Sequence, residues 1–206
     1  MSLESDFLGY FEVHSPEGIR ETLKAGASPV DPIKGKRPID ILIEMYARSP
    51  RFADCLRVML DAGATIDDTL LEAVLLDDDA ALRRTLKASS QSLERKLSPL
   101  CAYTCCKGVS ALHICAEFNS MRCAAALIEA GAAVNIRADV DANGIGGQTP
   151  LFHTVNSNRN YCRPVMGLYA QFHRKEADIY SNLSYLYRKR YGAEPPIQNV
   201  PNKYLS

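Results

Sequence analysis

The sequence lacks any long apolar run, and it lacks net charge. No stretch of its 206 residues approaches the ~18 consecutive apolar residues of a membrane-spanning helix, so we expect no membrane insertion. The 24 basic side chains are balanced by 24 acidic ones, which argues against a nucleic-acid-binding domain held by bulk electrostatics. The N-terminus has neither a basic segment nor an apolar stretch, so we expect no secretory signal.

The composition is that of a folded protein. Hydrophobic residues make up 47% of the chain and charged residues 23%, close to the average of globular proteins, so the chain is able to bury a core. The length corresponds to one domain of ~100–200 residues or two small ones. We predict a single domain over residues 1–206.

The number of cysteines is odd, which does not suit a secreted disulfide framework. Several of them lie in apolar, helix-like contexts, where a free cysteine behaves as a small hydrophobic residue. We therefore predict a reducing compartment, the cytoplasm. The seven residues are Cys55, Cys101, Cys105, Cys106, Cys115, Cys123 and Cys162.

A recurring helix end is the most informative feature of the chain. Gly26, Gly63 and Gly131 each stand between two alanines, and each follows an amphipathic stretch with leucine or isoleucine three positions earlier. Glycine at such a place ends a helix, because it adopts the left-handed conformation without a Cβ penalty. The glycines lie 37 and then 68 residues apart, which indicates a period near 34.

A recurring helix start precedes these glycines. Thr149-Pro150 places an N-cap residue before a proline at the first helical position, and Arg37-Pro38 and Ser110-Ala111 occupy equivalent places. Each unit is therefore two short helices followed by a turn. One such pair cannot bury its apolar face alone, so neighbouring pairs must stack into a solenoid.

The chain resembles the ankyrin-repeat family at these positions. The family signature, Thr-Pro-Leu-His-x-Ala, is matched best by residues 110–116, continuing to 130–135, and next best by residues 149–152. The resemblance implies an all-α ankyrin-repeat solenoid of about five helix-turn-helix units with degenerate terminal caps. We expect these units at residues 5–31, 34–67, 68–100, 107–138 and 147–180.

Three segments depart from the family pattern. Residues 91–107 are longer and more irregular than the usual turn, and residues 139–147 resemble an extended hairpin finger. The pattern also predicts a C-terminal capping helix over residues 176–191, followed by an extended tail over 192–206. A capping helix covers the open end of a solenoid, which accounts for the tyrosines and basic residues near its end without a nucleic-acid site.

The histidines do not indicate catalysis. His113 holds the signature position, and the resemblance implies that its side chain hydrogen-bonds backbone and ties neighbouring turns together. His14, His153 and His173 have no partners that would indicate a nucleophile and its base. We expect no catalytic residue and no cofactor.

Two segments contain metal-ligating residue types in unsuitable spacing. Cys101 and Cys105 form only one of the two ligand pairs that structural zinc needs. Residues 139–144 copy the first half of a calcium loop, but Pro150 stands where the loop needs a bidentate glutamate. The acidic residues 77–79 are explained by helix capping. We therefore predict no metal site.

The resemblance implies a protein–protein interaction module or scaffold rather than an enzyme. In the family, partners contact the finger turns and the first helix of each pair, on the concave side. We expect Met45, Leu76 and Phe118 to be apolar anchors there, unless each packs against an adjacent unit. The full predicted set is Lys36, Ile41, Glu44, Met45, Leu76, Asp77, Ile114, Glu117, Phe118, Gln148, His153, Asn156 and Ser157.

Alternatives to this interpretation remain open at this point. The chain is alternatively an enzyme or a metal-binding protein that uses the cysteine-rich segment 91–107 or the C-terminal region. It is also compatible with an effector that binds a host protein. Our prediction is a monomer that binds one partner protein of unknown identity and binds neither nucleic acid nor membrane.

Overall fold

The computed structural model describes residues 3–45, 47–99, 101, 106–140, 142 and 146–156. This part of the chain is all-helical and contains no strand, which confirms the predicted α class there. The elements are α1 (Leu3–Glu12), α2 (Pro16–Lys24), α3 (Pro38–Glu44), α4 (Phe52–Asp61), α5 (Thr69–Leu75), α6 (Asp79–Ala88), the short 3-10 helix η1 (Ser90–Leu93), α7 (Ala111–Phe118), α8 (Met121–Glu129) and α9 (Pro150–Asn156).

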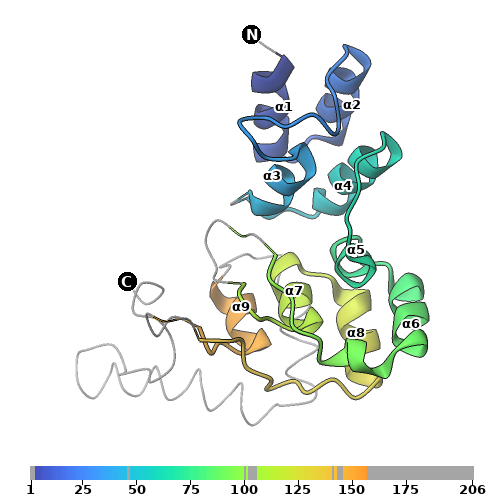
Figure 1. Cartoon of the computed structure of the whole chain (residues 1–206), viewed down its shortest axis with the longest axis vertical. Coiled ribbons are helices and arrows are strands. Elements are labelled where there is room, and N and C mark those ends of the chain that lie inside the picture. The colour runs from blue at the N-terminus through green and yellow to red at the C-terminus, as the bar shows by residue number, and fades with distance from the viewer. Residues whose placement is uncertain are drawn as a thin grey trace.

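The helices form successive pairs that stack on one another (Figure 1). Helices α1 and α2 pack together, as do α3 and α4, α5 and α6, and α7 and α8. Between pairs, α2 packs on α4, α6 on α8, and α7 on both α5 and α9. This is the helix-pair arrangement expected from the sequence, while the number of repeats remains a prediction.

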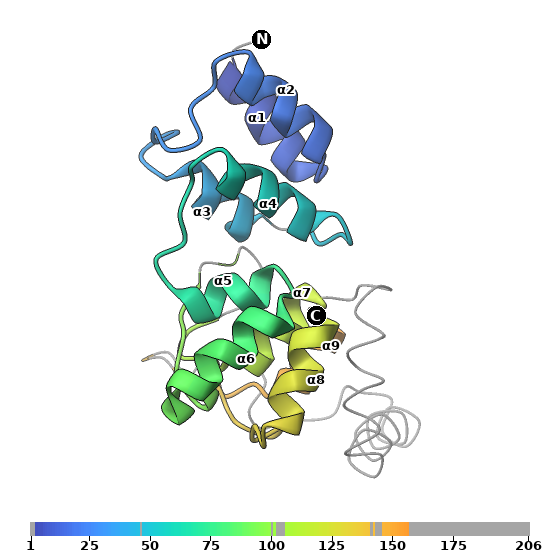
Figure 2. The same ribbon diagram turned by 90° about the vertical axis from the view of Figure 1, so that its right-hand side faces the viewer.

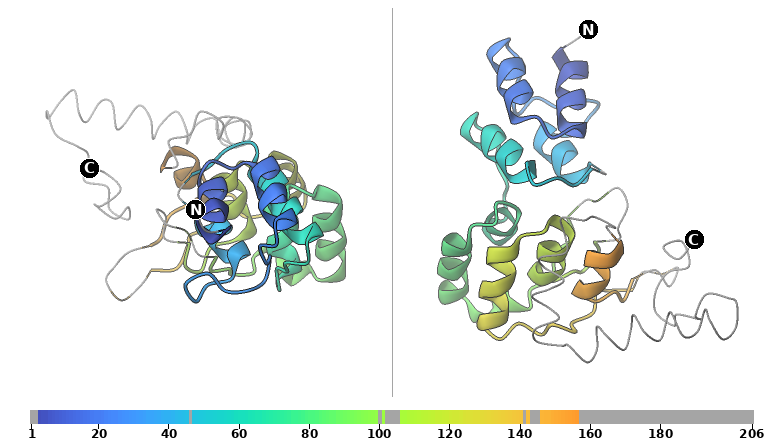
Figure 3. Two further views of the ribbon diagram at one scale, coloured as in Figure 1. Left: turned by 90° about the horizontal axis from the view of Figure 1, so that it is seen from above. Right: turned by 180° about the vertical axis from the view of Figure 1, so that it is seen from behind.

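The stack changes direction between the second and third pairs. Figure 1 shows α1–α4 stacked from top to middle, whereas α5/α6, α7/α8 and α9 follow one another from right to left below them. Two other views show the same separation into an upper and a lower part (Figures 2 and 3). Neither α3 with α5 nor α4 with α6 makes extensive contact, although all four helices are fully described. The result is a corner in the solenoid.

The predicted helix ends are confirmed. Gly26, Gly63 and Gly131 have φ angles of 103°, 102° and 91°, and each follows the last turn of a helix. Pro38 and Pro150 begin α3 and α9. Local backbone chemistry therefore sets both the starts and the ends of these short helices.

Aspartates cap two further helices, as predicted for residues 77–79. The side chain of Asp78 accepts a hydrogen bond from the backbone N–H of Ala81 at 2.9 Å, at the start of α6. Asp68 does the same for α5, accepting from Leu70 and Leu71 at 3.0 Å each. These carboxylates are accounted for by backbone donors that would otherwise be unsatisfied.

His113 has the structural role that the resemblance implies. Its Nδ1 accepts a hydrogen bond from the backbone N–H of Ser110 at 3.1 Å, which places the proton on Nε2. Nε2 then donates to the carbonyl oxygen of Gln148 at 2.9 Å. The side chain thus joins the start of α7 to the segment before α9.

The core runs through all the pairs, and α7 lies at the centre of the lower part. All residues from 111 to 117 are buried, because α7 contacts α5 on one side, α9 on the other and α8 along its length. Phe7 and Phe11 of α1 anchor the upper end, with ring centroids 4.7 Å apart. Among the described helices, none combines the length and apolar character needed to cross a membrane.

Ion pairs join the turns that precede successive helix pairs. Each links a basic residue near one turn to an acidic residue of another, and all are partly exposed, so each contributes little on its own. The pairs are Arg37–Asp67 (3.4 Å), Arg95–Asp68 and Lys96–Asp139 (3.3 Å). Leu97 and Val109 form two backbone hydrogen bonds with each other, which bring these two positions together.

The predicted capping helix 176–191, the tail 192–206 and the end of the unit 147–180 lie outside the described residues. The extended finger is described only in part, and Val140 and Gly146 form a single antiparallel bridge there.

We predict that Gly63→Ala lowers the free energy of unfolding by about 1–2 kcal/mol, because only the positive φ opposes the added methyl group. Gly9→Ala is the matched control. It lies in α1 with open space around it and no positive φ, so it is expected to stabilise the chain by about 0.5–1 kcal/mol. Urea denaturation measures both, and equal effects would contradict the predicted αL helix end.

Candidate functional site

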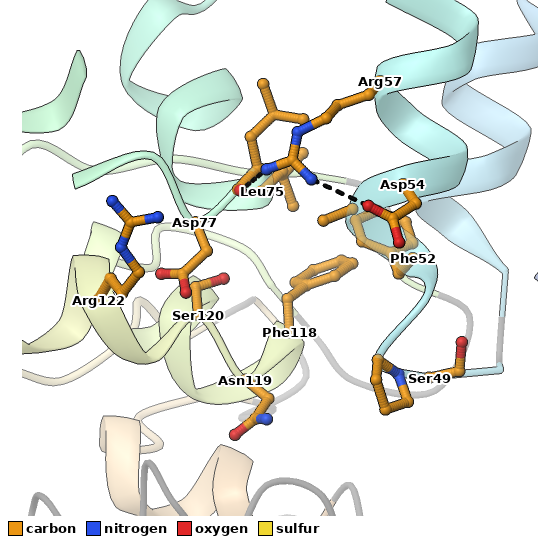
Figure 4. Close-up of a pocket in the computed structure, with 13 residues that line it drawn as sticks. Ser49, Phe52, Asp54, Arg57, Leu75, Asp77, Phe118, Asn119, Ser120 and Arg122 are labelled. Carbon is orange, nitrogen blue, oxygen red and sulfur yellow. Dashed lines mark hydrogen bonds and ion pairs between the residues drawn. The ribbon is translucent and has the colours of Figure 1, made fainter. Parts of the chain in front are cut away.

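A cleft of about 280 Å³ opens at the corner of the stack. It lies between the first half of α4, the end of α5, the end of α7 and the start of α8 (Figure 4). Its lining contains five apolar side chains larger than alanine, together with charged, amide and hydroxyl groups. The lining residues are Ser49, Pro50, Phe52, Ala53, Asp54, Arg57, Leu75, Leu76, Asp77, Phe118, Asn119, Ser120 and Arg122.

Two aromatic rings form the floor of the cleft. The ring centroids of Phe52 and Phe118 lie 4.9 Å apart, in a tilted arrangement. Phe52 is buried and Phe118 half-buried, and Leu76 beside them is also half-buried. The guanidinium carbon of Arg48 lies 4.3 Å from the Phe118 ring centroid, a cation–π contact that holds the ring in place.

Charged groups of both signs form the rim. Arg57 donates to the carbonyl oxygen of Leu76 at 2.8 Å and pairs with Asp54 at 3.1 Å. Asp77 accepts from the backbone N–H of Cys123 at 2.9 Å, and burial raises the pKa of its carboxyl group. Arg122 pairs with Asp79. The rim is thus hydrogen-bonded and nearly neutral around an apolar floor.

The cleft exists because the corner interrupts helix packing. Where pairs stack regularly, their helices approach closely, as α6 does α8. At the corner, long side chains span the gap instead, with Arg57 of α4 reaching the end of α5 and Phe52 reaching Phe118 of α7. These contacts fix the two parts of the stack against each other and leave space between them.

A buried ion pair lies directly behind the floor. Arg48 Nε and Glu117 Oε1 are 3.3 Å apart, with side chains only 3% and 4% exposed. Arg48 also donates to the carbonyl oxygen of Ala47 at 3.0 Å, and Glu117 Oε2 lies 3.2 Å from His153 Nδ1. The network joins the turn after α3 to α7 and α9.

Two buried histidines are uncharged at neutral pH. His14 lies with its Nδ1 2.9 Å from the hydroxyl oxygen of Ser49, and burial, followed by the charge of Arg48, lowers its pKa to about 4. Burial, followed by the charge of His153, lowers the pKa of His113 to about 3. Both are fully enclosed and make structural contacts.

The structure brings three of the predicted binding residues together in the cleft, namely Leu76, Asp77 and Phe118. The others on the surface lie elsewhere. Lys36, in the turn before α3, pairs with Glu44 at the end of α3, and both are partly exposed. Ile41 and Met45 are half-buried against the core.

Four predicted binding residues lie inside the fold, which corrects the expectation that they face a partner. Ile114, Glu117, Gln148 and His153 are at most 3% exposed. The reason is that α7 is enclosed between α5 and α9, so side chains on both sides of it pack against adjacent helices.

The side chains of the last two predicted residues lie outside the described part of the chain. Asn156 ends α9, with its side chain outside the described set, and Ser157 follows the last described residue. Sequence reasoning missed Phe52, Arg57 and Arg122, because they lie in second helices, which the family resemblance does not connect with binding. No feature of the sequence predicted the corner that brings them into one site.

Within the described residues, no group of three or more His, Cys, Asp and Glu side chains is arranged to hold a metal ion. Cys105 and part of the segment 139–144 lie outside these residues, so the absence of a zinc or calcium site there stays a prediction.

Comparison with known families identifies one part of the chain. Residues 107–139 match the family model of the ankyrin repeat. The match covers α7, α8 and the turn that follows, and it confirms the resemblance at the place where the signature is best. No curated protein matches the chain.

We predict that Glu117→Gln lowers the free energy of unfolding by about 3–5 kcal/mol, because it leaves the buried Arg48 charge without its partner. The same change in an exposed pair, Asp54→Asn, is expected to cost ~1 kcal/mol or less. Chemical denaturation at pH 7 compares them. Similar losses in both variants would show that Arg48 is not held by this pair.

We predict that acid destabilises the fold before most carboxylates titrate. The unfolded chain protonates its histidines near pH 6.5, whereas buried His14 stays neutral down to about pH 4. The contribution of such a histidine to stability is therefore constant above pH 6.5 and falls below it, by up to ~1.4 kcal/mol per pH unit for each histidine. Denaturation midpoints at pH 7, 6 and 5 measure the slope. His14→Asn, which tolerates the local φ of 48°, is expected to reduce it, and an unchanged slope would contradict the assignment.

Proposed function

We propose that this chain, which carries an ankyrin repeat at residues 107–139, is a protein-binding module. Ankyrin repeats are typically non-catalytic binding modules, and the stacked helices form a preorganised surface that loses little freedom on binding. The observation that carries the proposal is the cleft at the corner, where apolar side chains form the floor and charged groups form the rim. This composition matches the apolar centre and polar border of protein interfaces.

The cleft suits one apolar side chain of a partner. Phe118 and Leu76 remain partly exposed on its floor, and the Phe52 ring packs against Phe118. A leucine, methionine or phenylalanine placed there removes its own apolar surface and part of theirs from water, which contributes about 1.5–3 kcal/mol. Carbonyl and carboxylate oxygens on the rim then accept hydrogen bonds from the partner's backbone N–H groups next to that side chain.

The first helices and fingers extend the proposed surface. Lys36 and Glu44 present charge beside α3, where the predicted concave side lies. Val30 and Val140, in the turns, are 51% and 59% exposed and add apolar contacts. Ile41 and Met45 are half-buried at α3. These first-helix and turn residues support a partner that reaches beyond the cleft.

A catalytic or metal-binding role has no observation in its favour among the described residues. The histidines at the centre of the fold are buried and hydrogen-bonded. Residues 102–105 and the C-terminal region lie outside the described part, so the proposal rests on the surface features alone.

We predict that Ala53→Met, which fills the cleft from α4, weakens partner binding by about 10- to 100-fold, the loss of one buried anchor. The partner is first captured from source lysate on the immobilised chain and identified, and its affinity is then measured by titration. Ala80→Met places the same side chain on exposed α6 and is expected to bind like the parent. Because both substitutions lie in helices, we expect each variant to melt within a few degrees of the parent chain.

Equal affinities of the two methionine variants would show that the partner does not use the cleft. Failure to capture any protein, beyond those that an unrelated helical protein retains, would contradict the proposed function itself.

A further inference from the structure

One cysteine stands beside the buried ion pair. The Sγ atom of Cys101 lies 3.0 Å from Nη2 of Arg48 and 3.6 Å from Oε1 of Glu117. Cys101 is partly exposed and lies between Leu97 and Val109 in the sequence. A guanidinium at this distance stabilises a thiolate, and the carboxylate, which lies farther away, shares its charge with Arg48 and His153.

The other described cysteines lie in a different environment. Cys55, Cys115 and Cys123 are buried, and burial raises the pKa of each thiol, to about 12 for Cys55. Structural thiols that are buried are inert toward electrophiles and oxidants. Cys101 is the described cysteine that combines partial exposure with a guanidinium neighbour.

A second thiol is within reach. Cys106, at the other end of the same loop, is buried and forms a hydrogen bond with Cys101, and this bond together with burial raises its pKa well above the ordinary value. The pair therefore contains one thiol beside a guanidinium and one whose raised pKa keeps it protonated. This asymmetry defines which sulfur reacts first.

We propose that Cys101 and Cys106 form a peroxide-sensitive pair, in which Cys101 is oxidised first and Cys106 then closes a disulfide. The Cys101 thiolate attacks one oxygen of hydrogen peroxide, the O–O bond breaks, and sulfenic acid and hydroxide form. The Cys106 sulfur then attacks the Cys101 sulfur, the S–O bond breaks, and the departing hydroxide takes the Cys106 proton as water. Overall, two thiols are oxidised to one disulfide and one peroxide is reduced to two waters.

Oxidation acts on the joint between the two parts of the stack. Cys101 contacts both members of the buried pair, and Arg48 in turn lies over the Phe118 ring at the cleft floor. A disulfide replaces the sulfhydryl group that contacts Arg48 and Glu117. The thiol state of Cys101 is thus linked to the corner through direct contacts.

The first experiment treats the full chain with hydrogen peroxide and then alkylates the remaining thiols in denaturant. Mass spectrometry is expected to show loss of two hydrogens in the peptide 97–107, at least about tenfold faster than any change at Cys55, Cys115 or Cys123. Equal rates at all of these positions would overturn the proposal.

Two serine variants locate the bond, because the peptide also contains Cys105. In Cys105→Ser the disulfide is expected to persist. In Cys106→Ser it is expected to disappear, leaving a Cys101 sulfenic acid that dimedone traps. A disulfide that survives Cys106→Ser would assign the bond to another thiol and overturn the pairing.

The role of Arg48 has its own measurement on the unmodified fold. The rate at which iodoacetamide alkylates Cys101 in the native chain is followed against pH, and its midpoint is expected below the ~8.5 of a free cysteine. Arg48→Lys keeps the charge and is expected to keep a low midpoint. A parent midpoint at or above ~8.5 would overturn the activation by Arg48, whatever the stability of the variants.

Discussion

A helix of seven to ten residues is not stable by itself in water, and every α-helix described in this chain is that short. Each one persists because neighbours cover its apolar face. Helix α7 shows the limit of this dependence, since α5, α8 and α9 enclose it and leave residues 111–117 buried. Stability therefore passes from pair to pair along the stack, and a break in the stacking has consequences for shape and for surface.

The corner between α4 and α5 is such a break, and it explains the position of the cleft. Regular stacking would have covered Phe118 and Leu76 with another helix. Here Phe52 covers part of that surface and Arg57 reaches across the gap, so the apolar floor remains partly open. Rigid helices on all sides hold the opening in shape. The same break in stacking that reduces contact between the helix pairs thus forms the cleft.

The fold was largely predictable from the sequence because its signals are local. Gly26, Gly63 and Gly131 end helices through their own backbone conformation, and Pro38 starts one. The candidate site was predictable only in part. The pairing of Arg48 with Glu117 joins residues far apart in sequence across the corner, and no local signal specifies it. A shift of one position in the expected register of α7 changes whether Ile114 faces a partner or the core. In the structure Ile114 is buried, because neighbouring helices enclose α7.

The buried Arg48–Glu117 ion pair connects the two parts of the stack and also contacts the floor of the cleft. Removing two charges from water is costly, so Arg48 and Glu117 are held by further groups, namely backbone carbonyls, His153 and the Cys101 thiol. A hydrophobic pair of the same size would join the two parts as firmly, but it would not respond to chemistry at a neighbouring thiol. Because Arg48 also lies over the Phe118 ring, a change in charge or hydrogen bonding at Cys101 is two contacts away from the cleft floor.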